Sequence, residues 1–245
     1  MSTSNFPLLA TEALKIQRGT GNQAQLILNG TQNCAFTLES GNIHYLAGPS
    51  GVGKSTLLWT LARLHPLPAG LLWLNGQLHT KIALTRWRAE VALLPQQPVI
   101  QPGTVVDNLL YPLRTFQIQK ERLKERNESL PTTEKLLTKL ESIGLHNIPL
   151  ERDATSLSGG QQARLALIRL LLTKPKLILA DEPTAGLDEE ATKLVFDTLH
   201  QFCQTGGAVL FTSHVHGEDI NTAARITLTG NANLLFQTQT NKHSI

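Results

Sequence analysis

A glycine-rich segment of eight residues constrains this chain more than any other feature. It reads Gly48-Pro49-Ser50-Gly51-Val52-Gly53-Lys54-Ser55 and lies between an apolar run over residues 43–47 and a helical pattern over residues 54–64. This order brings backbone N–H groups and the positive end of a helix dipole to one point, where phosphate can bind. Lys54 then reaches the β- and γ-phosphates, Ser55 offers a hydroxyl to Mg²⁺, and Thr56 offers one to the α-phosphate. The chain is therefore predicted to bind a nucleotide.

Two adjacent carboxylates follow a second apolar run. Residues 177–180 read as a buried strand that ends at Asp181 and Glu182. Because neighbouring side chains of a strand point in different directions, one carboxylate can face a metal ion while the next faces the γ-phosphate. Asp181 is predicted on the metal side, and Glu182 is predicted as the base that polarises the attacking water.

Strand and helix patterns alternate along the chain, which predicts an α/β domain. Strands are expected at residues 8–16, 25–28, 43–47, 71–74, 77–80, 91–94, 177–180, 208–212, 226–228 and 234–236, and helices at 54–64, 158–172 and 189–202. Asn75-Gly76 predicts a tight hairpin turn. Residues 104–142 read as helical and more polar, with Pro112 and Pro131 as interruptions, and the basic stretch 114–126 as a solvated helix face.

Composition excludes several functional classes. Of 245 residues, 41% are hydrophobic and 17% charged, which is typical of neither a disordered chain nor a coiled coil. The net charge of +3 is not clustered, so no nucleic-acid partner is expected. No run of 18 apolar residues is present, and the first ten residues show no secretory signal. The two cysteines, Cys34 and Cys203, have no metal-ligand spacing, which favours a reduced, cytosolic chain.

A second helix start has the character of a phosphate site. In Leu157-Ser158-Gly159-Gly160-Gln161, Ser158 can cap the helix while two glycines expose backbone N–H groups. One nucleotide needs only one such loop, so a second helix end in the same chain requires an explanation.

This segment resembles the signature motif of ATP-binding cassette (ABC) proteins. Gln96 resembles the glutamine-loop residue of that family, and residues 185–188 and 212–214 resemble its later loop and its switch-histidine segment. The resemblance runs from about residue 8 to residue 228, with the motifs in the family's order. It implies a single ABC ATP-binding domain over 1–245, with an α/β P-loop NTPase core (8–95 and 170–236), an N-terminal antiparallel β subdomain and an inserted helical subdomain (about 96–169).

The resemblance also implies how the second helix end is used. Two copies, a homodimer or a pseudo-dimer, pack head to tail, so that Ser158, Gly159, Gly160 and Gln161 act on the ATP held by the partner. ATP and Mg²⁺ are the implied cofactors. Gln96 would sense Mg²⁺ and the attacking water, and His214 would contact the γ-phosphate. Asp188 would shape the interface between the copies.

One departure from the family concerns the nucleotide base. The family usually stacks adenine on an aromatic residue upstream of the phosphate loop, whereas this chain has no aromatic residue between Phe6 and Phe36. Ile16 matches that position best. An aliphatic platform keeps apolar contact but gives up stacking, worth about 0.5–1.5 kcal/mol, so weaker or less base-selective binding is expected.

The chain's place within the family follows from its length. With one cassette and no room for a C-terminal regulatory domain, it resembles a separate ATPase subunit that docks on a multi-spanning membrane permease. That places it at the cytoplasmic face of the inner membrane. Residues 96–113 are expected to line the groove for the permease, and residues 105–113 are similar to those of bacterial iron-export subunits.

Other readings stay open at this stage. Lipoprotein-release, cell-division and amino-acid-uptake cassettes share most of these motifs. A non-transport ABC ATPase acting in cell division or on nucleic acid is the alternative from another functional class. A binding module without catalysis is opposed by the intact Lys54, Asp181, Glu182 and His214.

Overall fold

The computed structural model describes residues 6–19, 24–213 and 222–238. The strands are β1 (Leu9–Arg18), β2 (Gln25–Asn29), β3 (Thr37–Leu38), β4 (Ile43–Ala47), β5 (Ala69–Leu74), β6 (Gln77–Leu78), β7 (Val91–Leu94), β8 (Leu177–Ala180), β9 (Ala208–Phe211), β10 (Ala224–Leu228) and β11 (Leu234–Thr238). The helices are α1 (Lys54–Leu61), α2 (Leu84–Glu90), α3 (Val105–Thr115), α4 (Gln117–Glu125), α5 (Thr133–Glu141), α6 (Gly159–Leu172) and α7 (Glu189–Gln204), with 3-10 turns η2 (His79–Lys81) and η3 (Ala154–Ser156).

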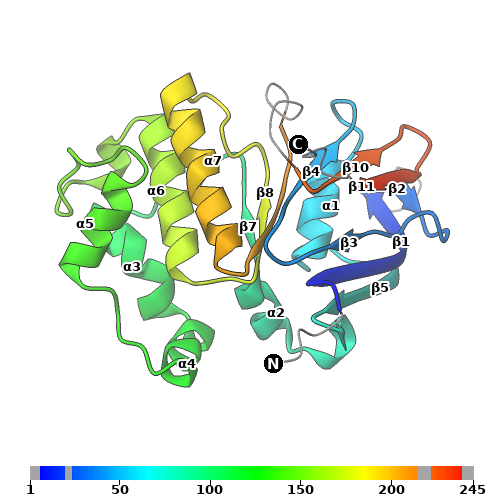
Figure 1. The fold of residues 1–245 in the computed structure, drawn as a ribbon, viewed down its shortest axis with the longest axis horizontal. Coiled ribbons are helices and arrows are strands. Elements are labelled where there is room, and N and C mark those ends of the chain that lie inside the picture. The colour runs from blue at the N-terminus through cyan, green and yellow to red at the C-terminus, as the bar shows by residue number, and fades with distance from the viewer. Residues whose placement is uncertain (1–5, 20–23, 214–221, 239–245) are drawn as a thin grey trace, which may run out of the picture.

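A largely parallel sheet forms the centre of the molecule (Figure 1). Its order is β11-β10-β4-β9-β8-β7, and only β11 runs antiparallel to its neighbour. Strands β4, β8 and β9 are buried along their whole length, because this sheet is covered on both faces. Alternate residues serve the two faces: Leu179 joins the core under the N-terminal sheet, and Ile178 joins the core under the helices.

The N-terminal strands form a second, antiparallel sheet. Its order is β2-β1-β5-β6, with β3 paired to β1, and it lies at the right of Figure 1, where β10 and β11 of the central sheet also lie. Helix α1 packs between the two sheets, where Leu57, Leu58 and Leu61 are fully buried. The hairpin predicted at Asn75-Gly76 is present, with φ of 49° and 74°, as a tight turn with a left-handed backbone requires. Its second strand stops at Leu78 because residues 79–81 turn into η2.

Helices α3 to α6 gather on the opposite side of the central sheet (Figure 1). The prediction that Pro112 interrupts this helical region is wrong, since Pro112 lies inside α3. A proline within a helix removes one backbone hydrogen bond, but the face of α3 that carries Pro112 is buried with Leu109 and Leu113. Burial of that face compensates for the lost bond. The helices instead break at Phe116 and between α4 and α5.

The basic stretch 114–126 is also only partly as expected. Arg114, Lys120 and Lys124 are exposed, in agreement with a solvated helix face. Arg122 is the exception, because its side chain is 4% exposed and lies inside the molecule.

Membrane crossing needs a helix longer and more apolar than any found in the three described ranges.

A candidate nucleotide-binding and hydrolysis site

The predicted site residues meet at one edge of the central sheet. Strands β4, β9, β8 and β7 are parallel neighbours, so their carboxyl ends lie side by side. The phosphate loop follows β4, the acidic pair follows β8, and Gln96 lies two residues beyond β7. In an open α/β sheet this edge is where ligands bind.

The phosphate loop depends on glycine at two places. Gly53 caps α1 with φ of 111°, and a Cβ there would lie 2.5 Å from Ile27 of β2. Gly48 has φ of 143°, and a Cβ there would lie 2.8 Å from the Leu228 carbonyl oxygen of β10. Both positions require a residue without Cβ. The loop is thus fixed between two strands, with its backbone bent around the N-terminus of α1.

Lys54 is the cation of this loop. Its side chain is 8% exposed, and its Nζ donates to the carbonyl oxygens of Gly48 at 2.8 Å and Pro49 at 3.1 Å. Burial lowers the pKa of Lys54, while the nearby charges of Glu182 and Asp181 oppose that shift. The ammonium is therefore held at the loop, next to two carboxylates, where it can pair with phosphate.

A threonine hydroxyl orients both members of the acidic pair. The Thr212 hydroxyl donates to Asp181 Oδ1 at 2.8 Å and accepts the Glu182 backbone N–H at 2.9 Å. Thr212 is fully buried, and Asp181 is 7% exposed. Glu182 has φ of 50°, an uncommon conformation for a residue other than glycine, and the contact with Thr212 helps to hold it.

Gln96 and Glu182 are in direct contact. Gln96 Nε2 donates to Glu182 Oε2 at 2.8 Å, although the two residues are 86 positions apart. With the amide in this orientation, the Gln96 carbonyl oxygen stays available to a cation. Gln96 is exposed and Glu182 half-buried, so water can reach both.

The oxygen groups at this edge fit Mg²⁺. Ser55 offers an exposed hydroxyl at the start of α1, Asp181 offers a carboxylate, and Gln96 an amide oxygen. These are hard donors, and they are too few to enclose the ion without nucleotide oxygens and water, as Mg²⁺ prefers. No cluster of three or more His, Cys, Asp or Glu residues suited to a metal occurs within the described ranges.

The second glycine-rich helix start is well formed. The Ser158 side chain accepts the Gln161 N–H at 3.3 Å, and Gln161 Oε1 accepts the Ser158 N–H at 3.0 Å. This capping box occupies the side chains of Ser158 and Gln161 locally. Ser158 and Gly159 are exposed, and a Cβ on Gly159 would meet no atom of the described chain within 4 Å. This end of α6 therefore presents free N–H groups outwards.

Ile16 is not an adenine platform, contrary to the expectation from the sequence. Its side chain is fully buried on the inner face of β1, the face it shares with Leu14, and is paired with Leu28 of β2. A cavity of about 240 Å³ lies beside the phosphate loop, and the exposed apolar residue in its lining is Leu26, which is 41% exposed. Strand alternation explains the error, since Ile16 faces the core and Leu26 faces outwards.

Sequence reasoning missed the residues that shape the loop after Gln96. Asn108 is fully buried, accepts the Gln101 N–H, and donates to the carbonyl oxygens of Gln101 and Thr104. Arg169 of α6 donates to the Val99 carbonyl oxygen at 2.7 Å. Asn108 could have been found in the sequence as a polar residue inside the apolar pattern of α3. The sequence contains no signal that Arg169 of α6 contacts Val99.

The structure also describes two of the later segments that the sequence singled out. Asp188 caps α7 by accepting the Ala191 N–H at 2.8 Å. The Ser213 carbonyl oxygen accepts from the Tyr45 hydroxyl at 3.1 Å. His214 lies outside the described residues.

A family model described as "ABC transporter" matches residues 31–185. The chain is 32% identical over 223 residues to the "Probable iron export ATP-binding protein FetA" of Escherichia coli, covering 91% of both chains. It is also 32% identical to the "Cell division ATP-binding protein FtsE" of Haemophilus influenzae, covering 78% of this chain and 83% of that protein. A "Lipoprotein-releasing system ATP-binding protein LolD" of Hyphomonas neptunium is 34% identical over 77% of this chain and 79% of that protein.

Solved structures have the same fold. The "Structure of ATP binding subunit of ABC transporter" superposes with a TM-score of 0.74, at 22% identity, and covers 94% of this chain and 90% of that chain. The "Structure of a bacterial Atm1-family ABC exporter with ATP bound" superposes with a TM-score of 0.78, at 19% identity. It covers 97% of this chain and 40% of that longer chain.

Proposed function

The chain belongs to the ABC transporter family as an ATP-binding, ATP-hydrolysing subunit, and on that premise we propose how its residues perform the reaction. The observation that carries the proposal is the meeting of Lys54, Asp181, Glu182 and Gln96 at one sheet edge, with Gln96 bonded to Glu182 at 2.8 Å. These are a phosphate-binding cation, a metal-side carboxylate, a base and a group that senses the base.

ATP binding starts at the phosphate loop. Backbone N–H groups of residues 48–53 and the N-terminus of α1 receive the phosphates, and Lys54 exchanges its carbonyl partners for the β- and γ-phosphate oxygens. Thr56 contacts the α-phosphate, and the base lies in the cavity beside Leu26. Ser55, Asp181 and Gln96 would hold Mg²⁺, which would neutralise phosphate charge there.

Hydrolysis uses Glu182 as the base. Glu182 accepts a proton from water as the water oxygen attacks the γ-phosphorus and the bond to the β–γ bridging oxygen breaks. Thr212 keeps the Glu182 backbone in place, and Gln96 fixes its carboxylate. His214 contacts the γ-phosphate.

Two copies complete two sites. The N–H groups at Gly159 and Gly160, with Ser158, contact the γ-phosphate held by the other copy. The support is the exposed, capped start of α6, which has no such ligand of its own. Subunits of this family dimerise and act with membrane permeases.

A permease is the proposed membrane partner. Apolar side chains are exposed along and after the loop that follows Gln96: Val99 is 64% exposed, Tyr111 37% and Phe116 49%. Val99 is three residues after Gln96 in the chain, so docking at this surface can influence the hydrolysis site.

The central test uses Glu182→Gln. Because a general base contributes about 10²–10⁴ in rate, turnover should fall at least a hundredfold while ATP now holds two copies together, as light scattering measures. Lys54→Ala in the same background should bind no ATP and form no dimer. Unchanged turnover in Glu182→Gln would refute the assigned base.

Purification from membranes should recover a multi-spanning protein, and recovery of nucleic acid alone would overturn the transporter role.

The finer proposal is export of metal, specifically iron. Its support is the match of 91% of both chains to a protein named for iron export, against 78% and 83% for the cell-division protein. Cells that lack this chain should accumulate iron under iron load, and the wild-type chain but not Glu182→Gln should restore the normal content. Normal iron with a division defect would instead favour the cell-division alternative.

A further inference from the structure

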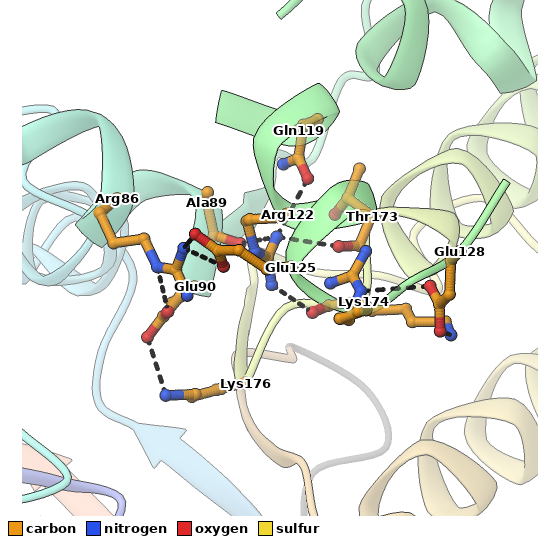
Figure 2. Close-up of polar contacts among 11 residues, drawn as sticks. Arg86, Ala89, Glu90, Gln119, Arg122, Glu125, Glu128, Thr173, Lys174 and Lys176 are labelled. Atoms are coloured by element: carbon orange, nitrogen blue, oxygen red, sulfur yellow. Dashed lines mark hydrogen bonds and ion pairs between the residues drawn. The ribbon is translucent and has the colours of Figure 1, made fainter. Parts of the chain in front are cut away.

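A buried arginine joins three parts of the chain at the end of the sheet away from the nucleotide site. Arg122 of α4 donates from Nη1 to the carbonyl oxygens of Ala89 at 2.8 Å and Thr173 at 2.9 Å, and to Gln119 Oε1 at 3.0 Å. Its Nη2 donates to the Lys174 carbonyl oxygen at 2.6 Å. Figure 2 shows the guanidinium among these acceptors. Three of the four acceptors are main-chain groups from other elements.

Helix ends explain how a charge is tolerated here. Ala89 lies in the last turn of α2, and Thr173 is the C-cap of α6, so Arg122 sits at two negative dipole ends. Burial lowers the pKa of Arg122 to about 10, with Arg126 and Arg86 adding to the shift and Glu90 and Glu125 opposing it. The guanidinium therefore stays charged at neutral pH.

Ion pairs surround Arg122 and join the same elements (Figure 2). Arg86 of α2 pairs with Glu125 of α4 at 2.6 Å, and Glu90 pairs with Lys176 at 3.0 Å. Glu128, in the segment that follows α4, pairs with Lys174 in the turn after α6. Ion pairs thus link α2, the region of α4 and the turn between α6 and β8, which the Arg122 guanidinium also joins.

The joined elements lead to the sheet-edge hydrolysis site or to the glycine-rich start of α6. Helix α6 has its C-terminal end beside Arg122 and its N-cap at Ser158. Helix α2 continues into β7, which is followed by Gln96. Lys176 directly precedes β8, and Asp181 directly follows it. A helix of 14 residues is about 21 Å long, so a tilt of about 5° at its end moves its start by about 2 Å. A displacement of that size separates hydrogen-bonding groups.

We propose that Arg122 is a positioning residue for ATP-driven pairing: it anchors the C-terminal end of α6 to the core so that Ser158 and Gly159 meet the nucleotide of the other copy. The inference rests on the proposed two-copy arrangement. Loss of the Arg122 guanidinium weakens the pairing of two copies and their ATP turnover. Nucleotide binding by one copy stays intact, because the phosphate loop does not touch this cluster.

Arg122→Lys keeps the charge but cannot reach acceptors on both sides at once. In the Glu182→Gln background we expect ATP-dependent dimerisation, measured by analytical ultracentrifugation, to weaken at least tenfold. In the chain that retains Glu182, kcat should fall about tenfold. Affinity of single copies for a fluorescent ATP analogue should stay within twofold. Arg114→Lys is the matched control, since Arg114 is exposed and, among the described residues, its ion pair is with Asp107 of its own helix.

Pairing and kcat within twofold of the Arg114→Lys control would overturn the proposal, even if Arg122→Lys lowers the melting temperature. An equal loss of nucleotide affinity and pairing would also overturn it. If Arg122→Lys does not fold, Glu125→Gln provides the test, because it removes the charge that forms the exposed ion pair with Arg86. ATP-dependent dimerisation should then weaken about threefold. Unchanged dimerisation in Glu125→Gln would refute the inference. Failure of Glu182→Gln alone to dimerise with ATP would instead refute the proposed function.

Discussion

At the scale of residues, the hydrolysis site depends on a few buried polar atoms. The Thr212 hydroxyl bridges Asp181 Oδ1 and the Glu182 N–H, and Gln96 holds the Glu182 carboxylate. A hydroxyl bonded both to a carboxylate and to the next backbone N–H sets the directions of the two neighbouring residues. Chemistry at this edge should therefore be sensitive to atoms that never touch ATP.

Replacing Thr212 with valine removes that bridge at nearly constant volume. The Glu182 N–H loses its acceptor, so the free energy of unfolding should fall by about 1–2 kcal/mol. Because the base is no longer oriented, kcat should fall at least tenfold with a smaller change in KM for ATP. Thr198→Val is the control, since the Thr198 hydroxyl bonds only the Leu194 carbonyl of its own helix. Equal kinetics in the two variants would show that the bridge has no part in turnover.

His44 predicts a pH dependence of stability. Burial lowers the pKa of His44 from 6.5 to about 4, against a smaller opposing effect of its bond to the Val209 carbonyl. Its Nε2 accepts the Glu39 N–H, so the folded chain holds the neutral ring. The contribution of neutral His44 to the free energy of unfolding is complete above pH 6.5 and is lost as pH falls towards 4. The reason is that His44 binds a proton more readily in the unfolded chain than in the folded chain. About 2 kcal/mol should disappear between pH 7.5 and pH 5.

Urea unfolding at both pH values measures this loss. His44→Gln should show a pH dependence smaller by about 2 kcal/mol than that of the wild-type chain, and exposed His146→Gln should match the wild type. A wild-type pH dependence retained in His44→Gln would contradict the assignment.

At the scale of elements, helix ends carry much of the function. Helix α1 begins at the phosphate loop, and α6 begins at the capped, exposed turn of Ser158. The two starts differ, since Gly53 is packed against Ile27 whereas Gly159 has open space around it. The glycine at α1 is needed by the fold, whereas no atom of the described residues comes close enough to require the one at α6.

Gly159→Ala separates these roles. Alanine favours a helix over glycine and meets no neighbour, so the free energy of unfolding should stay the same or rise by up to about 1 kcal/mol. ATP-driven dimerisation in the Glu182→Gln background should nevertheless weaken at least tenfold, because the partner's phosphate must approach this backbone closely. At Gly160 a Cβ would lie 2.9 Å from a terminal methyl of Leu187, which would have to move, so Gly159→Ala is the cleaner variant. Full dimerisation by Gly159→Ala would remove the support for contact in trans.

At the scale of the whole molecule, the proposed function gives one chain two half-sites. The phosphate loop and acidic pair stand on the central sheet, and the second helix start stands on the helical side of Figure 1. Arg122 and its ion pairs tie these regions at the far end of α6. In the proposed arrangement, a single copy binds ATP with one half-site and contacts the nucleotide of the other copy with the second.

This division predicts that activity depends on protein concentration. If turnover needs two copies, the rate per chain at saturating ATP should rise in proportion to concentration when dimers are scarce, and then level off. Steady-state ATPase assays over a hundredfold dilution range test this. The rate per chain of a Gly159→Ala protein should level off at higher concentration, and a rate per chain independent of dilution would mean that one copy suffices.

The sequence by itself determined the family, the order of strands and helices around the motifs, and the phosphate loop, because these depend on short spacings and on alternation along one segment. Segments 43–47, 91–94 and 177–180 appear as strands with those bounds. Helix α3 was the clearest local failure, since the burial that keeps Pro112 within it is not written in nearby residues.

Only the tertiary structure decided which side chains meet. Gln96 and Glu182 are 86 positions apart, and Arg122 and Lys174 are 52 apart. Ile16 and Arg122 were misplaced because the face that a strand or helix buries depends on what packs against it. Spacing in the sequence fixes local backbone form, whereas long-range packing and burial fix the contacts through which this chain works.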